Sequence, residues 1–276
     1  MTLKYIYKLI NYLYKDKKRV IAKDKKHLQA LIKKEMLFFG SQCNLNHIDT
    51  SVITDMSCLF KDSSFDGDIS QWNTSSVIDM SYLFKRCVFN GDISQWDVTK
   101  VNNMSQMFSY SNFNKDISGW STSKVENMNG IFYNSKFNGD ISKWNTSNVV
   151  NMSGMFALSI FNGDISAWDV SNLQDMKGIF AFSKFNGDIS QWNVSNVQDM
   201  YRAFECSVFN GDISQWYCIR VEDLRDILSG CVTAIPYWSK IENFLDRRHA
   251  VEAYHTQKTL QKTIGDKSNN KSSFKI

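Results

Sequence analysis

Histidine is scarce in this chain, and its absence from the most regular part of the sequence bears on catalysis. All four histidines, His27, His47, His249 and His255, lie outside residues 65–216, where the sequence repeats itself. No Ser-His-Asp or Cys-His set can therefore be assembled from the sequence, and no glycine-rich phosphate-binding loop is present. We therefore expect no catalytic residue, no cofactor and no enzymatic activity, and we do not expect a small-molecule substrate.

Long apolar runs are lacking as well. No stretch approaches the roughly 20 apolar residues that are needed to span a bilayer. Lys4 and Lys8 interrupt the apolar residues near the N-terminus, and no small-residue cleavage site follows them, so no secretory signal is predicted. We expect the unmodified chain to be soluble.

The six cysteines show neither a repeated column nor the short paired spacing of a zinc site. We therefore expect no metal site and mostly buried, reduced thiols. Position 230 falls one repeat after Cys206, so a bridge between Cys206 and Cys231 is the single disulfide that the spacing leaves open.

Repetition is what the sequence has in abundance. The motif Phe, Asn or Asp, any residue, Asp, Ile, Ser, any residue, Trp occurs seven times at a period of 24 residues, without insertion or deletion. Its last position is held by Trp72, Trp96, Trp120, Trp144, Trp168, Trp192 and Trp216. A fixed period of about 20 to 50 residues is typical of solenoids, in which each unit buries its apolar face only against its neighbours.

One repeat, residues 161–184, predicts two kinds of local structure. The Ile-Ser-x-Trp segment carries β-branched and aromatic residues between turn formers, which favours a short strand in a parallel ladder. Asp175 precedes Met176, Ile179 and Phe180, a spacing that predicts a short helix behind an N-cap. The chain is therefore expected to be an α/β repeat solenoid with one short parallel strand and one short helix in each 24-residue coil.

Both ends of the array are expected to be covered by helices. Asp24 and the amphipathic pattern after it predict a basic helical cap within residues 1–42, followed by the repeat solenoid over 43–232. The only proline, Pro236, precedes a helical pattern that predicts a C-terminal cap over 233–266. The polar segment 267–276 is expected to be a disordered tail.

Charge is divided unevenly along the chain. Residues 47–232 carry 13 basic and 21 acidic side chains, whereas the flanking segments are basic. A nucleic-acid groove needs Lys and Arg on its contact face, so the acidic array argues against a nucleic-acid partner. Residues 1–19 combine basic with apolar and aromatic side chains, as interfacial helices do, which leaves a membrane surface open as a partner.

The motif Phe-Asn-Gly-Asp-Ile-Ser-x-Trp-Asp-Val-Ser-Asn-Val-x-x-Met-Ser-x-Met-Phe resembles the leucine-rich repeats of BspA-like surface proteins, a repeat type also common in mycoplasma and other host-associated bacteria. The resemblance covers about residues 43–230. It implies a right-handed solenoid of leucine-rich-repeat type, display at the cell surface or secretion, and binding of host or partner proteins. Because no signal peptide is predicted, a cytoplasmic location stays open beside this implication.

Three columns of the repeat are constant enough to indicate structure. We expect the Trp column to form core and the Asn column, which includes Asn90 and Asn138, to form a turn ladder. Each member of the Asp column is expected to accept backbone N–H bonds within its own turn, with a row of Ca²⁺ sites as the alternative. The Asp column comprises Asp68, Asp92, Asp116, Asp140, Asp164, Asp188 and Asp212.

Recognition requires positions that vary from coil to coil, and two neighbouring columns vary. Together they contain Tyr110, Tyr133, Leu158 and Phe182, which we predict to form an exposed aromatic and apolar stripe that binds a protein. The alternative is that Leu158 and Phe182 tuck beneath the next coil. A second variable set, with Gln71, Gly119 and Lys143 among its members, is expected on the sheet surface.

These observations favour a non-enzymatic scaffold that recognises a host or partner protein through variable positions of a rigid surface. The partner's identity does not follow from the sequence. Two alternatives remain: an intracellular effector or toxin-neutralising protein, and a membrane-peripheral protein attached through residues 1–19.

Overall fold

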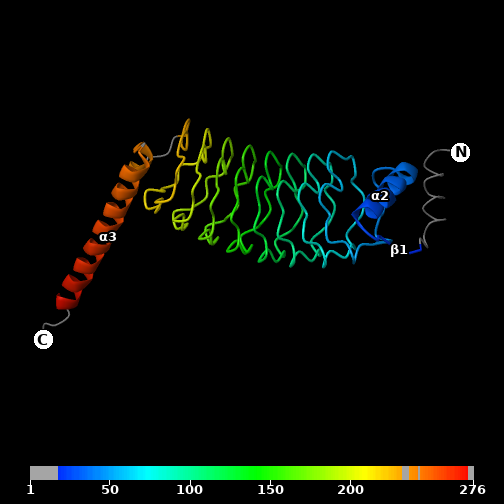
Figure 1. Ribbon diagram of the computed structural model, residues 1–276, viewed down its shortest axis with the longest axis horizontal. Helices are drawn as coiled ribbons and strands as arrows, with labels where there is room; N and C mark the ends of the chain where they lie inside the picture. The colour runs from blue at the N-terminus through cyan, green and yellow to red at the C-terminus, as the bar shows by residue number, and fades with distance from the viewer. Residues whose placement is uncertain (1–17, 232–235, 242, 273–276) are drawn as a thin grey trace.

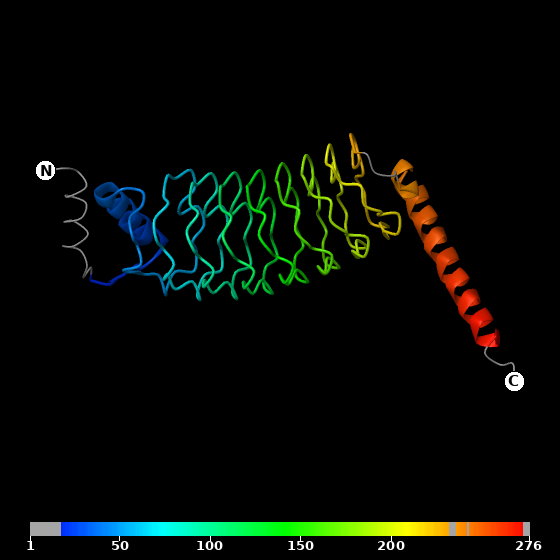
Figure 2. The same cartoon turned by 180° about the vertical axis from the view of Figure 1, so that it is seen from behind.

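The computed structural model describes residues 18–231, 236–241 and 243–272 of the chain. Coils of 24 residues stack on one another along its length, as Figure 1 and the view from behind in Figure 2 show. Helix α2 (Lys25–Phe39) lies at the N-terminal end of the stack, and helix α3 (Phe244–Ser272) follows its C-terminal end. The remaining regular elements are strands β1 (Val20–Ile21) and β2 (Ile48–Asp49) and the 3₁₀ helix η1 (Tyr237–Lys240).

The coils are held in register by parallel pairing between residues 24 positions apart. Single bridges join each coil to the next from Asp55↔Asp79 through Asp199↔Asp223. Around each bridge, alternate backbone N–H groups donate to the following coil: Gly154 to Lys177 O at 2.7 Å, Phe156 to Ile179 O at 2.9 Å and Leu158 to Ala181 O at 2.8 Å. The repeat predicted from the Trp column is therefore confirmed as the structural unit.

The predicted short helix in each coil is wrong. Gly178 and Phe182 have φ of 56° and 55°, in the left-handed region, whereas an α-helix needs φ near −63° throughout. The segment instead forms successive turns, in which Ile179 N donates to Met176 O at 3.1 Å and Phe182 N donates to the next coil. Apolar residues three and four positions apart face the core in such turns as they would on a helix, which explains the error.

The predicted strand at Ile-Ser-x-Trp is also wrong. Trp168 N donates to Ile165 O at 3.2 Å, which closes a turn where an extended segment was expected. Among the described residues the only strands are β1 and β2, which pair in parallel through Val20↔Ile48 and Ile21↔Asp49. Each coil is therefore built from turns and one bridge rather than from the α/β alternation that the sequence suggested.

Stacked aromatic rings form the core, as predicted for the Trp column. The seven repeated tryptophans are 1–4% exposed. Each indole N–H donates to a backbone carbonyl of the preceding coil at 3.0–3.2 Å, as Trp144 does to Ile117 O. A parallel column of phenylalanines from Phe60 to Phe204 stacks with ring centroids 5.6–5.9 Å apart. Burial and indole hydrogen bonding thus explain why these positions do not vary.

The Asp column forms the expected turns. In every member one carboxylate oxygen accepts the backbone N–H two residues ahead at 2.8–3.0 Å, as Asp164 does from Ser166. From Asp92 to Asp212 this bond is the main reason that the carboxyl pKa lies below its usual value. The part of the chain that the structure describes contains no cluster of three or more His, Cys, Asp or Glu that could hold a metal ion.

The Asn column forms the expected ladder, but the ladder runs between coils. The backbone N–H of Asn138 donates to Asn114 Oδ1 at 2.9 Å, and this bond recurs from Asn90 to Asn210 at 2.7–2.9 Å. All six cysteines are free thiols, so the bridge between Cys206 and Cys231 is not formed. Position 230 does lie beside Cys206, since a Cβ on Gly230 would stand 2.8 Å from the Cys206 Sγ.

Helix α2 packs on the first coil. Asp24 accepts the His27 N–H at 2.7 Å, which is the predicted N-cap, and Leu28 and Ile32 are buried. The Lys25 ammonium lies 2.9 Å from a carboxylate oxygen of Asp55. Residues 1–17, which hold most of the expected membrane-attachment segment, lie outside the described residues.

At the other end, Trp238 of η1 and Val251 of α3 are buried, while the C-terminal part of α3 extends away from the coils (Figure 1). Helix α3 continues through Ser272, so residues 267–272 are helical where a disordered tail was expected. Extending an existing helix adds one hydrogen bond for each residue fixed and needs no new nucleus, which explains the continuation. Residues 273–276 lie outside the described residues. None of the described helices is apolar enough over sufficient length to cross a membrane.

Candidate binding groove

A groove of about 810 Å³ runs along one face of the stack, from Lys85 to Glu205. All four residues of the predicted stripe line it: Tyr110, Tyr133, Leu158 and Phe182. Tyr110, Leu158 and Phe182 are 40%, 43% and 49% exposed, so the alternative in which the last two tuck beneath the next coil does not hold. The second variable set, represented by Gly119 and Lys143, does not line this groove.

Backbone conformation explains why these side chains stand at the surface. Each coil passes through the left-handed region twice, at two positions four residues apart. The second position is held by Tyr110, Leu158 and Phe182, at φ of 57°, 58° and 55°. A bulky residue in this conformation costs roughly 1–2 kcal/mol, and glycine would avoid that cost. Because every coil has these two left-handed positions, the strained backbone belongs to the repeat, and the coils along the groove differ in placing large apolar side chains there.

The floor of the groove is made by glycines at the first left-handed position. Gly130, Gly154 and Gly178 have φ of 54°, 60° and 56°, at a column where other coils carry side chains such as Gln106 and Arg202. A Cβ on Gly154 would meet its nearest neighbour, a Tyr133 ring carbon, at 3.6 Å, which is ordinary van der Waals contact. Side chains can therefore fit here, and their absence in three successive coils leaves the groove open.

The middle of the groove is apolar and aromatic. The rings of Tyr110 and Tyr133 lie with their centroids 5.3 Å apart at 54° to each other. Burial, together with the neighbouring phenol of Tyr110, raises the pKa of Tyr133. Ala157 and Ala181 are buried beside Leu158 and complete the apolar section.

Cations lie at both ends of the groove. At the N-terminal end the guanidinium of Arg86 lies 5.1 Å from the centre of the Tyr110 ring, and the Lys85 ammonium donates to Gln106 Oε1. At the C-terminal end, Lys177 and Arg202 flank the ring of Tyr201, at 5.1 Å and 4.8 Å from its centre. Burial, followed by repulsion from Lys61 and Arg86, lowers the pKa of Lys85.

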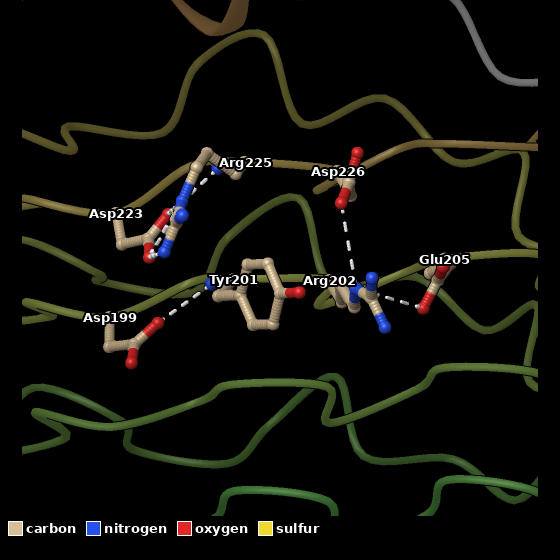
Figure 3. Close-up of polar contacts among 7 residues, drawn as sticks. All are labelled: Asp199, Tyr201, Arg202, Glu205, Asp223, Arg225 and Asp226. Atoms are coloured by element: carbon tan, nitrogen blue, oxygen red, sulfur yellow. Dashed lines mark hydrogen bonds and ion pairs between the residues drawn. The ribbon is translucent and has the colours of Figure 1, made fainter.

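Figure 3 shows how differently the two arginines at the C-terminal end are held. Arg225, which lies outside the groove, forms a forked contact with Asp223, with its closest N–O distance at 2.6 Å. Arg202 stands between Glu205 and Asp226, 3.5 Å from an oxygen of each. Charge-assisted hydrogen bonds to carboxylates are about 2.7–2.9 Å long, so the donors of Arg202 are less fully engaged than those of Arg225.

The groove also differs in charge from the array around it. Four cations line it, together with one carboxylate, Glu205. Residues 47–232 as a whole carry 13 basic and 21 acidic side chains, so their net charge is negative, whereas the net charge of the residues that line the groove is positive. Such a local reversal steers a partner of opposite charge toward the site.

Sequence reasoning found the stripe but missed the floor and the C-terminal rim. The column that contains Lys177 and Tyr201 holds Ser or Asn in all the earlier coils, such as Ser153, and that change is a signal that the sequence does carry. The three floor glycines also repeat in consecutive coils at a position that varies elsewhere. These glycines form the floor because the backbone there is left-handed, and the helix expected from the sequence contains no left-handed residues.

Comparison with protein families gave one match. Residues 30–138, 109–204 and 134–238 each match the family model described as "Mycoplasma protein of unknown function, DUF285", and together they cover about three quarters of the chain. No curated protein and no solved structure matched the chain.

Proposed function

We propose that this chain, which belongs to the family described as "Mycoplasma protein of unknown function, DUF285", is a non-enzymatic scaffold that binds a protein partner in its groove. The observation that carries the proposal is that the exposed variable residues Tyr110, Leu158 and Phe182 converge on one groove of an otherwise regular repeat. Aromatic side chains in a concave, preformed site are typical anchors for protein recognition.

Rigidity supports binding at this surface. The backbone of each stripe residue is bonded to an adjacent coil, as Tyr110 N donates to Tyr133 O at 2.8 Å and Phe182 N donates to Glu205 O at 2.7 Å. The conformational entropy of these residues is lost when the protein folds and is not lost again when a partner binds. A preformed groove therefore keeps more of its interaction energy as affinity.

The proposal also covers the architecture of the stack and the place where the protein acts. The stack is a solenoid of leucine-rich-repeat type, whose open ends are covered by α2 and by η1 with α3. Burial of Leu28 and Trp238 at the two ends supports this view, since terminal units need a covering element. Recognition of a host protein at the cell surface, as in BspA-like proteins, is the setting we propose.

An unbiased peptide display selection tests binding in the groove. Random peptides are selected on the immobilised full chain, and each enriched peptide is then measured against a Gly154→Gln variant. Gln106 already occupies this column at φ 54°, so the backbone accepts glutamine there. We expect the added side chain to fill the groove floor and to weaken the enriched peptides roughly tenfold or more.

The matched control is Gly119→Gln. Gly119 has no neighbour within 4 Å of its Cβ direction, and its column holds glutamine in other coils, as at Gln71 and Gln95. This variant should bind like the parent chain. Peptides that bind the Gly154→Gln chain as tightly as the parent, or a selection that enriches no peptide, would count against the proposal.

A further inference from the structure

We propose that the groove holds an extended peptide segment of its partner, with an apolar centre and a carboxylate side chain near each end. This inference rests on the function proposed above and specifies the partner's chemistry. It follows from the length of the groove and from the order of apolar and charged residues along it. It also follows from the long distances between the arginine at each end and the carboxylates beside it.

The length sets the size of the segment. Arg86 and Arg202 are five coils apart in the stack, and adjacent chains that pair in parallel lie about 4.8 Å apart, so the two ends are separated by roughly 24 Å. An extended chain advances about 3.3–3.6 Å per residue. A segment of about seven residues therefore reaches from one cationic end to the other.

The row of glycines along the floor favours an extended chain. Such a chain places alternate side chains on one face, so they can reach the space above Gly130, Gly154 and Gly178.

The two arginines have donors to offer. Arg86 lies 3.8 Å from the nearest oxygen of Asp62, and Arg202 lies 3.5 Å from each of its two carboxylates. The corresponding distance is 2.9 Å for Arg19 with Asp49, outside the groove. The side chains of Arg86 and Arg202 are 58% and 46% exposed. A partner carboxylate can therefore form closer hydrogen bonds with each guanidinium than its present neighbours do.

The order of residues argues against single-stranded nucleic acid. A nucleic-acid strand carries phosphates along its whole length and needs cations throughout the groove. Between Arg86 and Lys177 the groove is lined by uncharged residues, including Tyr133 and Leu158. The face of Tyr110, which could stack on a base, is approached by the Arg86 guanidinium. An acidic peptide with an apolar centre matches this order, and a polyanion does not.

Synthetic peptides test the inference on the full chain. The first peptide is Glu-Glu-Leu-Ala-Val-Ala-Leu-Glu-Glu, labelled with a fluorophore. The second has the same composition with the four glutamates in the middle, the third has lysines in place of the glutamates, and a single-stranded RNA octamer is the fourth probe. Fluorescence anisotropy at low and high salt gives each Kd. We expect the first peptide to bind roughly tenfold or more tightly than the others, and to weaken with salt.

Three variants locate the charges. Arg86→Gln and Arg202→Gln should each weaken the first peptide by roughly two- to fivefold, as expected for exposed ion pairs. The matched control Arg220→Gln removes an exposed arginine outside the groove and should leave the affinity unchanged. Circular dichroism confirms that each variant is folded.

The outcomes separate this inference from the function on which it rests. Equal binding of the first two peptides, no binding of the first peptide, or no effect of either groove arginine would overturn the inference. Tighter binding of the RNA octamer would overturn it as well. If display selection still enriches peptides that Gly154→Gln weakens, the groove binds protein and only the proposed partner chemistry is wrong.

Discussion

The division between a constant core and a variable surface can be tested with the substitution Trp144→Ala. Trp144 is 3% exposed and lies against two other rings, with centroids 6.3 Å from Trp120 and 6.0 Å from Phe132. Its indole N–H donates to Ile117 O at 3.1 Å. Alanine removes the packing and the hydrogen bond together.

The expected loss can be estimated from these contacts. Truncation of a buried tryptophan to alanine costs about 3–5 kcal/mol, because a cavity remains. The carbonyl of Ile117 also accepts the Trp120 backbone N–H at 3.2 Å, so it is not left unpaired, and the lost indole bond adds only about 1 kcal/mol. We therefore expect Trp144→Ala to lower the free energy of unfolding by about 4–6 kcal/mol. Trp144→Phe keeps most of the volume and should cost about 1 kcal/mol beyond any local repacking.

Urea denaturation followed by circular dichroism measures the loss. Since each coil contacts only its neighbours, the defect should be concentrated nearby, and hydrogen exchange should show faster opening in the coils around Trp144 than near Trp72. The surface counterpart is Tyr133→Ala, which removes a half-buried ring over the groove and should cost about 1 kcal/mol or less. Equal large losses at Trp144 and Tyr133 would refute the assignment of the Trp column to the core and of Tyr133 to the binding surface.

Three further predictions concern other parts of the chain. Leu28→Ala, in the buried face of α2, should cost about 2–5 kcal/mol and speed hydrogen exchange in the first coil, whereas exposed Leu37→Ala should have little effect. The pKa values of all seven carboxyls in the Asp column lie below 3.8 in the folded chain. The ionised carboxylates therefore stabilise the fold above about pH 4, and this stabilisation is lost as the pH falls through the pKa values of the folded state. The melting temperature should drop steeply below pH 4. Tyr237→Phe should stabilise the chain by about 1 kcal/mol in urea denaturation, because the Tyr237 hydroxyl is buried and has no hydrogen-bond partner among the described residues.

Much of the repeat's geometry could be predicted from its constant columns. The period and burial of tryptophan predicted stacked units, and the turn preference of Asp predicted the bond between Asp164 and Ser166. The local conformation could not be predicted in the same way. Phe182 is a poor residue for the left-handed region, and its conformation is set by the bond from its N–H to Glu205 O in the next coil. Tertiary pairing here overrides intrinsic preference, and single-sequence patterns do not contain that pairing.

The candidate site was predictable to the extent that it depends on side-chain variation. Tyr110, Tyr133, Leu158 and Phe182 stood out because they lie in two neighbouring columns that vary within an otherwise regular repeat. The groove itself could not be inferred, since it results from the absence of side chains at Gly130, Gly154 and Gly178. A glycine within an expected helix gives no indication of a surface depression, whereas a glycine at φ 60° beside a tyrosine ring does.

The hydrogen bonds between the backbones of adjacent coils explain how one fold can carry a surface that differs from coil to coil. At Tyr110, Leu158 and Phe182 the link to the next coil is made by the backbone N–H, so it does not depend on the side chain. The buried columns on either side, such as Phe156 and Ile179, supply the packing. Substitutions at the left-handed positions therefore change the groove while the stacking energy is retained, apart from the cost of the strained backbone. A binding surface of this kind can vary freely only because the constant columns and the backbone ladder hold the stack.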